Sequence, residues 1–161
     1  MNYRFLLDEN VFYQILESSS TCLQALTLLV QKCHKVVFTS TLIGKYWEII
    51  KKVGYLKNKN IAHLLTIWLR DVLTNRDKYI LEEKLKRKLP TELRERLRQE
   101  KREEPDLLFI DLAITSRSLL VSNNLRLIKK FKKIGVPSEY LDILTCEEVL
   151  QLISNRSKSP P

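Results

Sequence analysis

Short apolar runs alternate with longer amphipathic segments along most of the chain. The apolar runs, each ending at polar or turn-forming residues as buried parallel strands do, are 3–7, 36–38, 119–121 and 140–144. The segments with apolar residues at helical spacing are 11–17, 22–32, 42–54, 61–73, 106–117, 125–134 and 145–154. This alternation predicts an α/β protein, a three-layer α/β/α sandwich with a central parallel sheet.

Residues 75–104 interrupt the alternation with a dense mixture of basic and acidic side chains. Leucine recurs there at every fourth position, at Leu81, Leu85, Leu89, Leu93 and Leu97. This spacing and a break at Pro90 predict an inserted charged helical hairpin with one packed face. Exposed salt bridges account for most of its charge, and a nucleic-acid arm or a dimer contact is the alternative.

The composition fits one domain over residues 1–154, followed by a tail over 155–161 that is predicted to be disordered. No apolar run reaches the roughly 18 residues that span a bilayer, and no signal peptide is evident at the N-terminus. We therefore expect a cytoplasmic protein that is not in a membrane.

Lys and Arg number 28 against 19 Asp and Glu, a net charge of +9. This balance favours a polyanionic partner, although solubility or a thermophile-like surface would also explain it.

The cysteines and histidines carry little sign of chemistry. Cys22, Cys33 and Cys146 are widely spaced and form no C-x-x-C pair, which predicts reduced, half-buried thiols and no structural zinc site. His34 and His63 lie far apart, with no Ser or Cys motif near either. A His-dependent catalytic triad is therefore not expected.

The candidate chemistry lies where predicted strands end, because parallel sheets bind ligands beyond the carboxyl ends of their strands. Asp8 follows an apolar strand, and Asn10 can cap the next helix without it, which makes Asp8 a candidate ligand for a hard cation. Its candidate partners are Glu48, Asp106 and Asp111. Each of these acids also has an ordinary alternative as a helix cap or a solvated helix position. No glycine-rich loop follows a strand, which excludes dinucleotide and P-loop nucleotide binding.

Three blocks, in this order, resemble the PIN domain family of metal-dependent nucleases, which includes toxins of prokaryotic toxin–antitoxin modules. They are LLDENVF at 6–12, STLIGKYWEII at 40–50 and DLLFIDLAITSRSLLVSNNL at 106–125. Asp8 and Asp106 match acidic positions of the family, and Asp111 falls where many toxin-like relatives have an acid. The blocks follow the order of nearly the whole chain apart from the charged segment.

Two positions depart from the family pattern. Lys45 stands where the family usually has Glu, and Asn124 where the last strand usually delivers Asp. Glu48 lies about one helical turn beyond Lys45, but roughly 60° away around the helix. To take the place of the family's Glu, the Glu48 side chain would therefore have to reach the site from a different direction. Asn124 can offer a carbonyl oxygen without negative charge. The resemblance therefore implies Mg²⁺ or Mn²⁺ as a weakly bound cofactor.

The resemblance implies a ribonuclease that hydrolyses RNA phosphodiesters with metal-bound carboxylates. The implied catalytic residues are Asp8, Asp106, Glu48 and Asp111. The implied metal ligands are Asp8, Asp106, Asp111 and Asn124. An antitoxin protein and a second copy of the chain in a homodimer are the implied protein partners. A catalytically degenerate PIN fold that binds RNA or a protein is the alternative.

Substrate binding is predicted at the strand ends and on the helix over 125–134. Its basic residues recur at i, i+3, i+4 and i+7, so they share one face that would form a phosphate track, or else a solvated surface. The predicted substrate-binding residues are Asn10, Lys45, Ser122, Arg126, Lys129, Lys130 and Lys133. A response-regulator receiver, which also has an acidic pair after its first strand, is excluded because its other acidic and lysine positions are missing.

Overall fold

In the computed structural model, residues 2–17, 19–99, 107–138 and 141–157 are described. Five parallel strands form one sheet in the order β3-β2-β1-β4-β5. They are β1 (Arg4–Leu7), β2 (Lys35–Phe38), β3 (Tyr79–Leu81), β4 (Leu119–Val121) and β5 (Ile143–Leu144). The sheet is thus wholly parallel, as the alternating pattern predicted.

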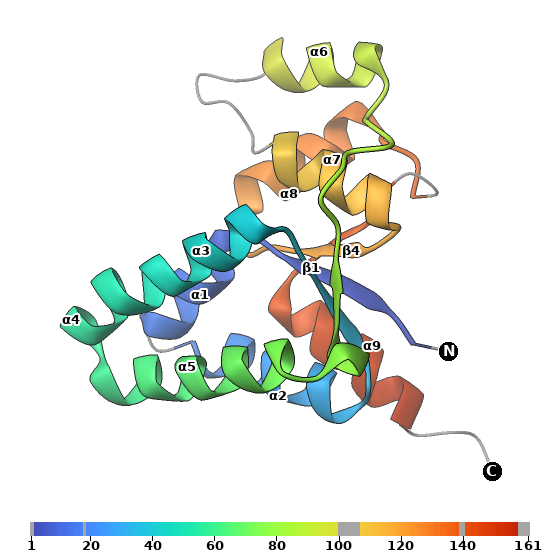
Figure 1. Ribbon diagram of the computed structural model, residues 1–161. Coiled ribbons are helices and arrows are strands. Elements are labelled where there is room, and N and C mark those ends of the chain that lie inside the picture. Colours follow the sequence, from blue (N-terminus) through green and yellow to red (C-terminus); the bar gives the residue numbers. More distant parts are fainter. Residues whose placement is uncertain (1, 18, 100–106, 139–140, 158–161) are drawn as a thin grey trace.

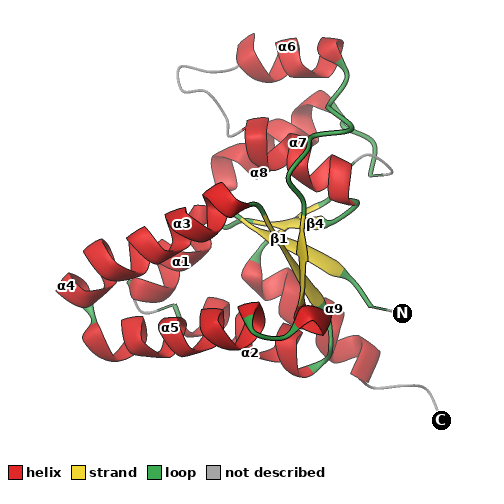
Figure 2. Cartoon of the chain, viewed as in Figure 1, coloured by secondary structure: helices red, strands yellow, loops and turns green. Residues whose placement is uncertain are grey.

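Helices cover both faces of this sheet, so the predicted three-layer α/β/α architecture is confirmed. The helices are α1 (Glu9–Leu16), α2 (Ser20–Gln31), α3 (Ser40–Glu48), α4 (Tyr55–Lys57), α5 (Lys59–Leu73), α6 (Thr91–Gln99), α7 (Leu107–Ser116), α8 (Leu125–Ile134) and α9 (Cys146–Ser157). A π-helical turn at Ile49–Gly54 joins α3 to α4. Figures 1 and 2 show α7 and α8 on one side of the sheet and α2, α5 and α9 on the other. Among the described helices, none is long and apolar enough to cross a membrane.

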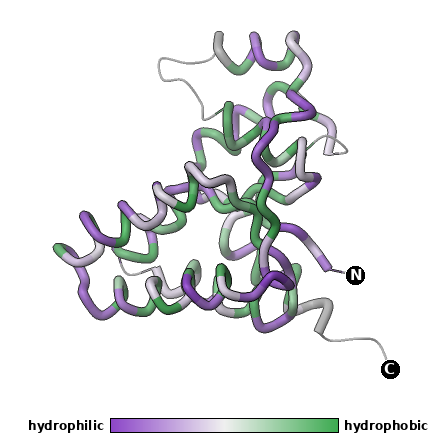
Figure 3. The backbone as a smooth tube through the Cα atoms, viewed as in Figure 1, coloured by the Kyte–Doolittle hydropathy of each residue, from purple (hydrophilic) through white to green (hydrophobic). Residues whose placement is uncertain are grey.

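The core is built around β1, which pairs with β2 on one side and β4 on the other. Phe5, Leu6 and Leu7 are fully buried, because helices cover the strand on both faces. Figure 3 shows the hydrophobic residues concentrated along the strands and the adjoining helices. The continuous apolar run of β1 is therefore the consequence of its central place in the sheet.

The predicted helical hairpin is wrong in its first half. Tyr79–Leu81 forms strand β3 beside β2, and Leu81 is 50% exposed instead of buried. Aromatic and β-branched residues at 79 and 80 suit a strand, and β2 would otherwise present an unpaired edge. Pairing with β2 thus overrides the local leucine periodicity. The second half does contain a helix, α6, while 100–104 lie outside the described residues.

The predicted tail also begins too early. Helix α9 continues through Ser157, so 155–157 are helical, whereas 158–161 lie outside the described residues. The polar composition of residues 155–157 predicts disorder. A helix already started by buried residues such as Val149 and Ile153 can, however, extend by further backbone hydrogen bonds.

The prediction of three reduced, half-buried thiols is wrong as well. Cys22 and Cys146 form a disulfide with 5.0 Å between their Cα atoms, and both are fully buried. The pairing arises because α2 packs against α9, which brings together cysteines that are 124 positions apart. No sequence spacing indicates such a contact. Cys33 is an exposed free thiol.

The segment between β3 and α6 is anchored to α7. The backbone N–H of Arg87 donates to Thr115 Oγ1 at 3.0 Å, and that hydroxyl donates to the Arg87 carbonyl at 2.8 Å. Further along, the Asp111 carboxylate accepts from the Leu89 N–H at 3.1 Å and from Arg94 Nη1 at 2.6 and 2.7 Å. Only 5% of the Asp111 side chain is exposed. This carboxylate therefore holds α6 against the core.

Opening the Cys22–Cys146 disulfide should lower the free energy of unfolding by roughly 4–5 kcal/mol, because it frees a long closed loop in the unfolded chain. Urea unfolding with and without reductant measures this difference. A Cys33→Ser variant should show the same difference, since Cys33 is unpaired. Identical midpoints with and without reductant would contradict the prediction.

Replacing Arg94 with Met should destabilise the protein by about 3 kcal/mol, because it leaves the buried Asp111 carboxylate without its countercharge. Arg96→Met is the matched control on the same helix, since Arg96 holds only an exposed i, i+4 pair with Glu92. That change should cost at most about 0.5 kcal/mol. Equal losses in chemical denaturation of the two variants would refute the anchoring role.

Candidate active site

The candidate site lies where β1 and β4 end side by side. Leu7 is in register with Val121, and the N–H of Asp8 donates to the Val121 carbonyl at 2.9 Å. Asp8 directly follows β1 and Ser122 directly follows β4, and Ser122 Oγ donates to Asp8 Oδ2 at 2.8 Å. Ser122 is fully buried and Asp8 is 7% exposed. The parallel pairing thus places a carboxylate at the carboxyl edge of the sheet.

The Asp8 side chain does not cap helix α1, although Asp8 occupies the N-cap position. The ordinary interpretation of this acid as a helix cap is therefore wrong. A buried carboxylate is costly unless other groups stabilise it, which makes its surroundings the important feature of the site.

Asparagine side chains and Ser122 hold those surroundings in place. Ser122 Oγ accepts from Asn10 Nδ2 at 3.3 Å and from the N–H of Asn124 at 3.1 Å. Asn10 Oδ1 in turn accepts from the N–H of Asn123 at 3.3 Å. The predicted substrate-binding residues Asn10 and Ser122 are therefore part of the network that orients Asp8.

Tyr46 is a member of the site that the sequence analysis did not identify. Its hydroxyl donates to the carbonyl of Leu7, and its ring stacks on Phe12 with 4.5 Å between centroids. Burial raises the pKa of Tyr46 well above its usual value, and the negative charges of Asp8 and Glu9 raise it further. The phenol consequently stays protonated and serves as a fixed donor. Its sequence signal is the helical spacing of Tyr46 with the buried Leu42, which indicates an inward face.

Lys45 lies next to this site. Its ammonium is 2.7 Å from Oε1 of Glu9, which is the residue directly after Asp8 in the chain. The Lys45 side chain is 45% exposed and that of Glu9 is 21% exposed. The position where the PIN pattern has a carboxylate thus carries a cation that is paired with the neighbouring acid.

Two of the predicted catalytic acids have other partners. The Glu48 side chain is 59% exposed and pairs with Lys52 at 3.0 Å, because its place on α3 turns it toward solvent. Asp111 is turned toward the segment from Leu89 to Arg94. Asp106 lies outside the described residues. The predicted convergence of acids is therefore not found for Glu48 or Asp111.

The described residues do not by themselves fit a divalent metal. Asn124 Oδ1, the expected neutral ligand, accepts from the N–H of Leu127 at 3.3 Å and so caps α8. Over the described ranges, no group of three His, Cys, Asp or Glu side chains is close enough to hold an ion. Asp8 is the buried acid at this strand end, and the adjacent Glu9 is paired with Lys45.

Helix α8 begins at this same strand end and has two distinct faces. Its inner face consists of the buried residues Leu127, Ile128, Phe131 and Ile134. Arg126, Lys129 and Lys133 are exposed on the other face, and Lys130 is partly exposed. Gly135, with φ +69°, ends the helix in the left-handed conformation that favours glycine. The basic face therefore starts within a few residues of Ser122.

Asn123 ties the site to the disulfide, a connection that no sequence motif indicates. Its Nδ2 donates to Cys22 Sγ at 3.1 Å, and its Oδ1 accepts from the N–H of Cys146 at 3.0 Å. Its own N–H donates to Asn10. The loop after β4 is thus held from three directions.

Comparison with known proteins identifies the fold. No protein-family model and no curated protein matches the chain. Among solved structures, the chain is similar to one in the crystal structure of VapBC2 from Rickettsia felis bound to a DNA fragment from their promoter. The two are 21% identical, the match covers 88% of this chain and 98% of that chain, and the TM-score is 0.50. The likeness supports a PIN-like α/β/α fold, consistent with the fold that the sequence predicted.

Proposed function

We propose that this protein is a PIN-type metal-dependent ribonuclease with Asp8 at its centre. The observation that carries the proposal is a buried carboxylate at the carboxyl edge of a parallel sheet, oriented by Ser122 and not used as a helix cap. Folding does not require a charge in this position, because an apolar residue would be easier to bury there. A buried acid at this place in a PIN-like fold favours a chemical role.

In this proposal Asp8 and Asp106 hold Mg²⁺ or Mn²⁺, which supplies charge neutralisation and water activation when bound. Ser122 and Asn10 fix the orientation of the Asp8 carboxylate. Lys45 adds a cation near the phosphodiester, and the basic face of α8 binds the flanking phosphates. Pairing of Glu9 with Lys45 leaves fewer carboxylates for the metal than the family pattern provides, so we expect weak metal binding.

We further infer that the protein acts as a toxin whose partner is an antitoxin protein. The support is the fold likeness to a chain of the VapBC2 complex from Rickettsia felis. We also propose that two copies of the chain pair as a homodimer.

A catalytically degenerate PIN fold that binds RNA is the second candidate. The observations that favour it are the ion pair of Lys45 with Glu9, the use of Asn124 as a helix cap and the use of Asp111 as an anchor. Each of these removes a position from the expected metal site. The two candidates differ in whether the purified protein cleaves RNA.

Asp8→Asn should abolish divalent-metal-dependent cleavage of single-stranded RNA, because it removes the central negative charge. Ser122→Ala should reduce cleavage about 10- to 100-fold, since it releases the carboxylate that Ser122 orients. Gel-resolved cleavage with Mn²⁺ and with EDTA measures both effects.

Asp77→Asn is the control for this series, because Asp77 is exposed in the short helical turn before β3. Its activity should equal that of the unmodified protein. Metal-dependent cleavage that survives Asp8→Asn would sink the ribonuclease proposal at this site, and no cleavage by any variant would favour the RNA-binding alternative.

Replacing Arg126, Lys129, Lys130 and Lys133 with Gln should weaken RNA binding for every sequence tested. Phosphate contacts release counterions, so the slope of log affinity against log salt should fall in magnitude by up to about 3 for single-stranded RNA. Fluorescence anisotropy in EDTA at several salt concentrations measures both quantities.

The matched control removes the same charge from another surface, through Gln at the exposed Lys51, Lys52, Lys57 and Lys59. This variant should keep most of the affinity and the salt slope. Equal losses in the two variants would mean that net charge, and not the α8 face, governs RNA binding.

A further inference from the structure

A cavity of about 610 Å³ lies at the opposite edge of the sheet from Asp8. Leu119, the first residue of β4, and Asp142, which precedes β5, belong to its wall. It is therefore at the amino edge of these strands, whereas Asp8 and Ser122 follow the carboxyl ends. Its volume is within the range of roughly 300–1,000 Å³ that is typical of small-molecule sites.

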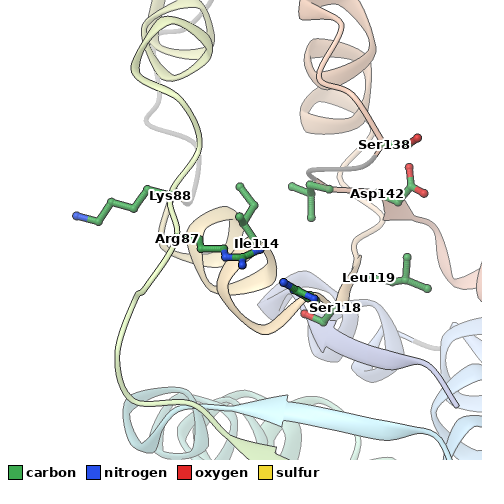
Figure 4. Close-up of a pocket in the computed structure, with 9 residues that line it drawn as sticks. Arg87, Lys88, Ile114, Ser118, Leu119, Ser138 and Asp142 are labelled. Atoms are coloured by element: carbon green, nitrogen blue, oxygen red, sulfur yellow. The ribbon is translucent and has the colours of Figure 1, made fainter.

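The wall of this cavity is chemically divided. Its basic lining residues are Arg87, Lys88 and Arg117, and its other polar lining residues include Ser138 and Asp142. Figure 4 shows Arg87 near Ile114 on one side of the cavity, and Ser138 and Asp142 on the other. Apolar residues, including Ile114 and Leu119, also line it. A ligand that fits must combine an anionic group, an apolar body and hydroxyl or amino donors.

The backbone of Arg87 is held in position by the side chain of Thr115. Thr115 of α7 both donates to its carbonyl and accepts from its N–H, as described above. In Figure 4 the side chain of Arg87 reaches toward Ile114, whereas that of its neighbour Lys88 extends away from the other labelled residues. Both residues belong to the cavity wall, and Arg87 is the one of the two whose side chain turns toward the other labelled residues.

Arg117 holds an unusual backbone conformation. It has φ +53°, in the left-handed region, directly after the end of α7. The N–H of Arg117 donates to Ile114 O at 3.3 Å and that of Ser118 to Ala113 O at 3.0 Å, the Schellman arrangement in which this position is usually glycine. Helix α8 follows that usual rule with Gly135. Cys33 after α2 has the same kind of conformation, and at both positions glycine would fit the backbone without strain.

No ion pair within the described ranges neutralises either guanidinium. Within the described part of the chain, the ion pairs involve other cations and none joins Arg87 or Arg117 to a carboxylate. Guanidinium groups bind phosphate through two parallel hydrogen bonds, and two of them lining one cavity favour a doubly charged phosphate monoester.

We propose that this cavity binds a 5′-mononucleotide. The phosphate contacts Arg87 and Arg117, the ribose hydroxyls donate to the Asp142 carboxylate, and the base lies against the apolar wall. The nucleotide is either free or the terminal residue of a 5′-phosphorylated RNA, since both present the same group. The proposal is independent of the ribonuclease proposal, because the cavity contains none of the residues of the Asp8 site.

The test is calorimetric titration of the full chain in EDTA with AMP, adenosine, inorganic phosphate and a 5′-phosphorylated trinucleotide. We expect AMP to bind at least about tenfold more tightly than adenosine or phosphate alone, because each of these lacks one half of the contacts. Binding of the trinucleotide as tightly as AMP supports RNA ends as the source. Weaker binding of the trinucleotide supports the free nucleotide.

Arg117→Gly is the decisive variant. It should weaken AMP binding at least about tenfold, while the melting temperature stays the same or rises, because glycine favours this backbone conformation. Lys86→Gln removes the same charge from an exposed residue of the segment before α6 that is not in the cavity wall, and it should bind AMP normally. Asp8→Asn should also bind AMP normally, so that loss of ribonuclease activity and loss of nucleotide binding are separate results.

Several results would overturn the proposal. These are no measurable binding of AMP, equal affinity of AMP and inorganic phosphate, or equal loss in the Arg117→Gly and Lys86→Gln variants. The last would show that net positive charge, and not the cavity, attracts the nucleotide.

Discussion

The pairing of β1 with both β2 and β4 is the constraint on which the rest of the structure depends. It places Phe5, Leu6 and Leu7 in the middle of the sheet, and the register with β4 sets Asp8 beside Ser122. Because strand pairing fixes both backbones, the distance between these side chains is a property of the sheet and not of a flexible loop. Any chemistry at Asp8 therefore relies on the central strands of the sheet.

The buried disulfide between α2 and α9 supports the same end of the sheet. Asn123 contacts both cysteine residues and Asn10, so the loop after β4 is connected to α1, α2 and α9 together. A disulfide that closes a long loop stabilises mainly by limiting the unfolded chain. Here it also fixes the place where α2 and α9 meet the loop after β4, through the contacts of Asn123 with both cysteines.

The charged segment after β3 changes how the acids of the chain are used. Asp111 accepts hydrogen bonds from Leu89 and Arg94, so a carboxylate that the PIN pattern assigns to the metal instead holds α6. The added segment also contributes Arg87 to the cavity at the amino edge of the sheet. The segment thus forms part of the wall of a cavity and is more than a solvated surface.

The sequence by itself determined the parallel α/β architecture, because buried strands and amphipathic helices have different hydrophobic periods that are visible locally. It also identified Asp8, since a charged residue directly after an apolar strand is conspicuous. Tertiary structure alone decided that residues 79–81 form an edge strand, that Cys22 pairs with Cys146, and that Asp111 faces Arg94. These outcomes join residues that are distant along the chain, and local periodicity contains no information about which distant partner a side chain will meet.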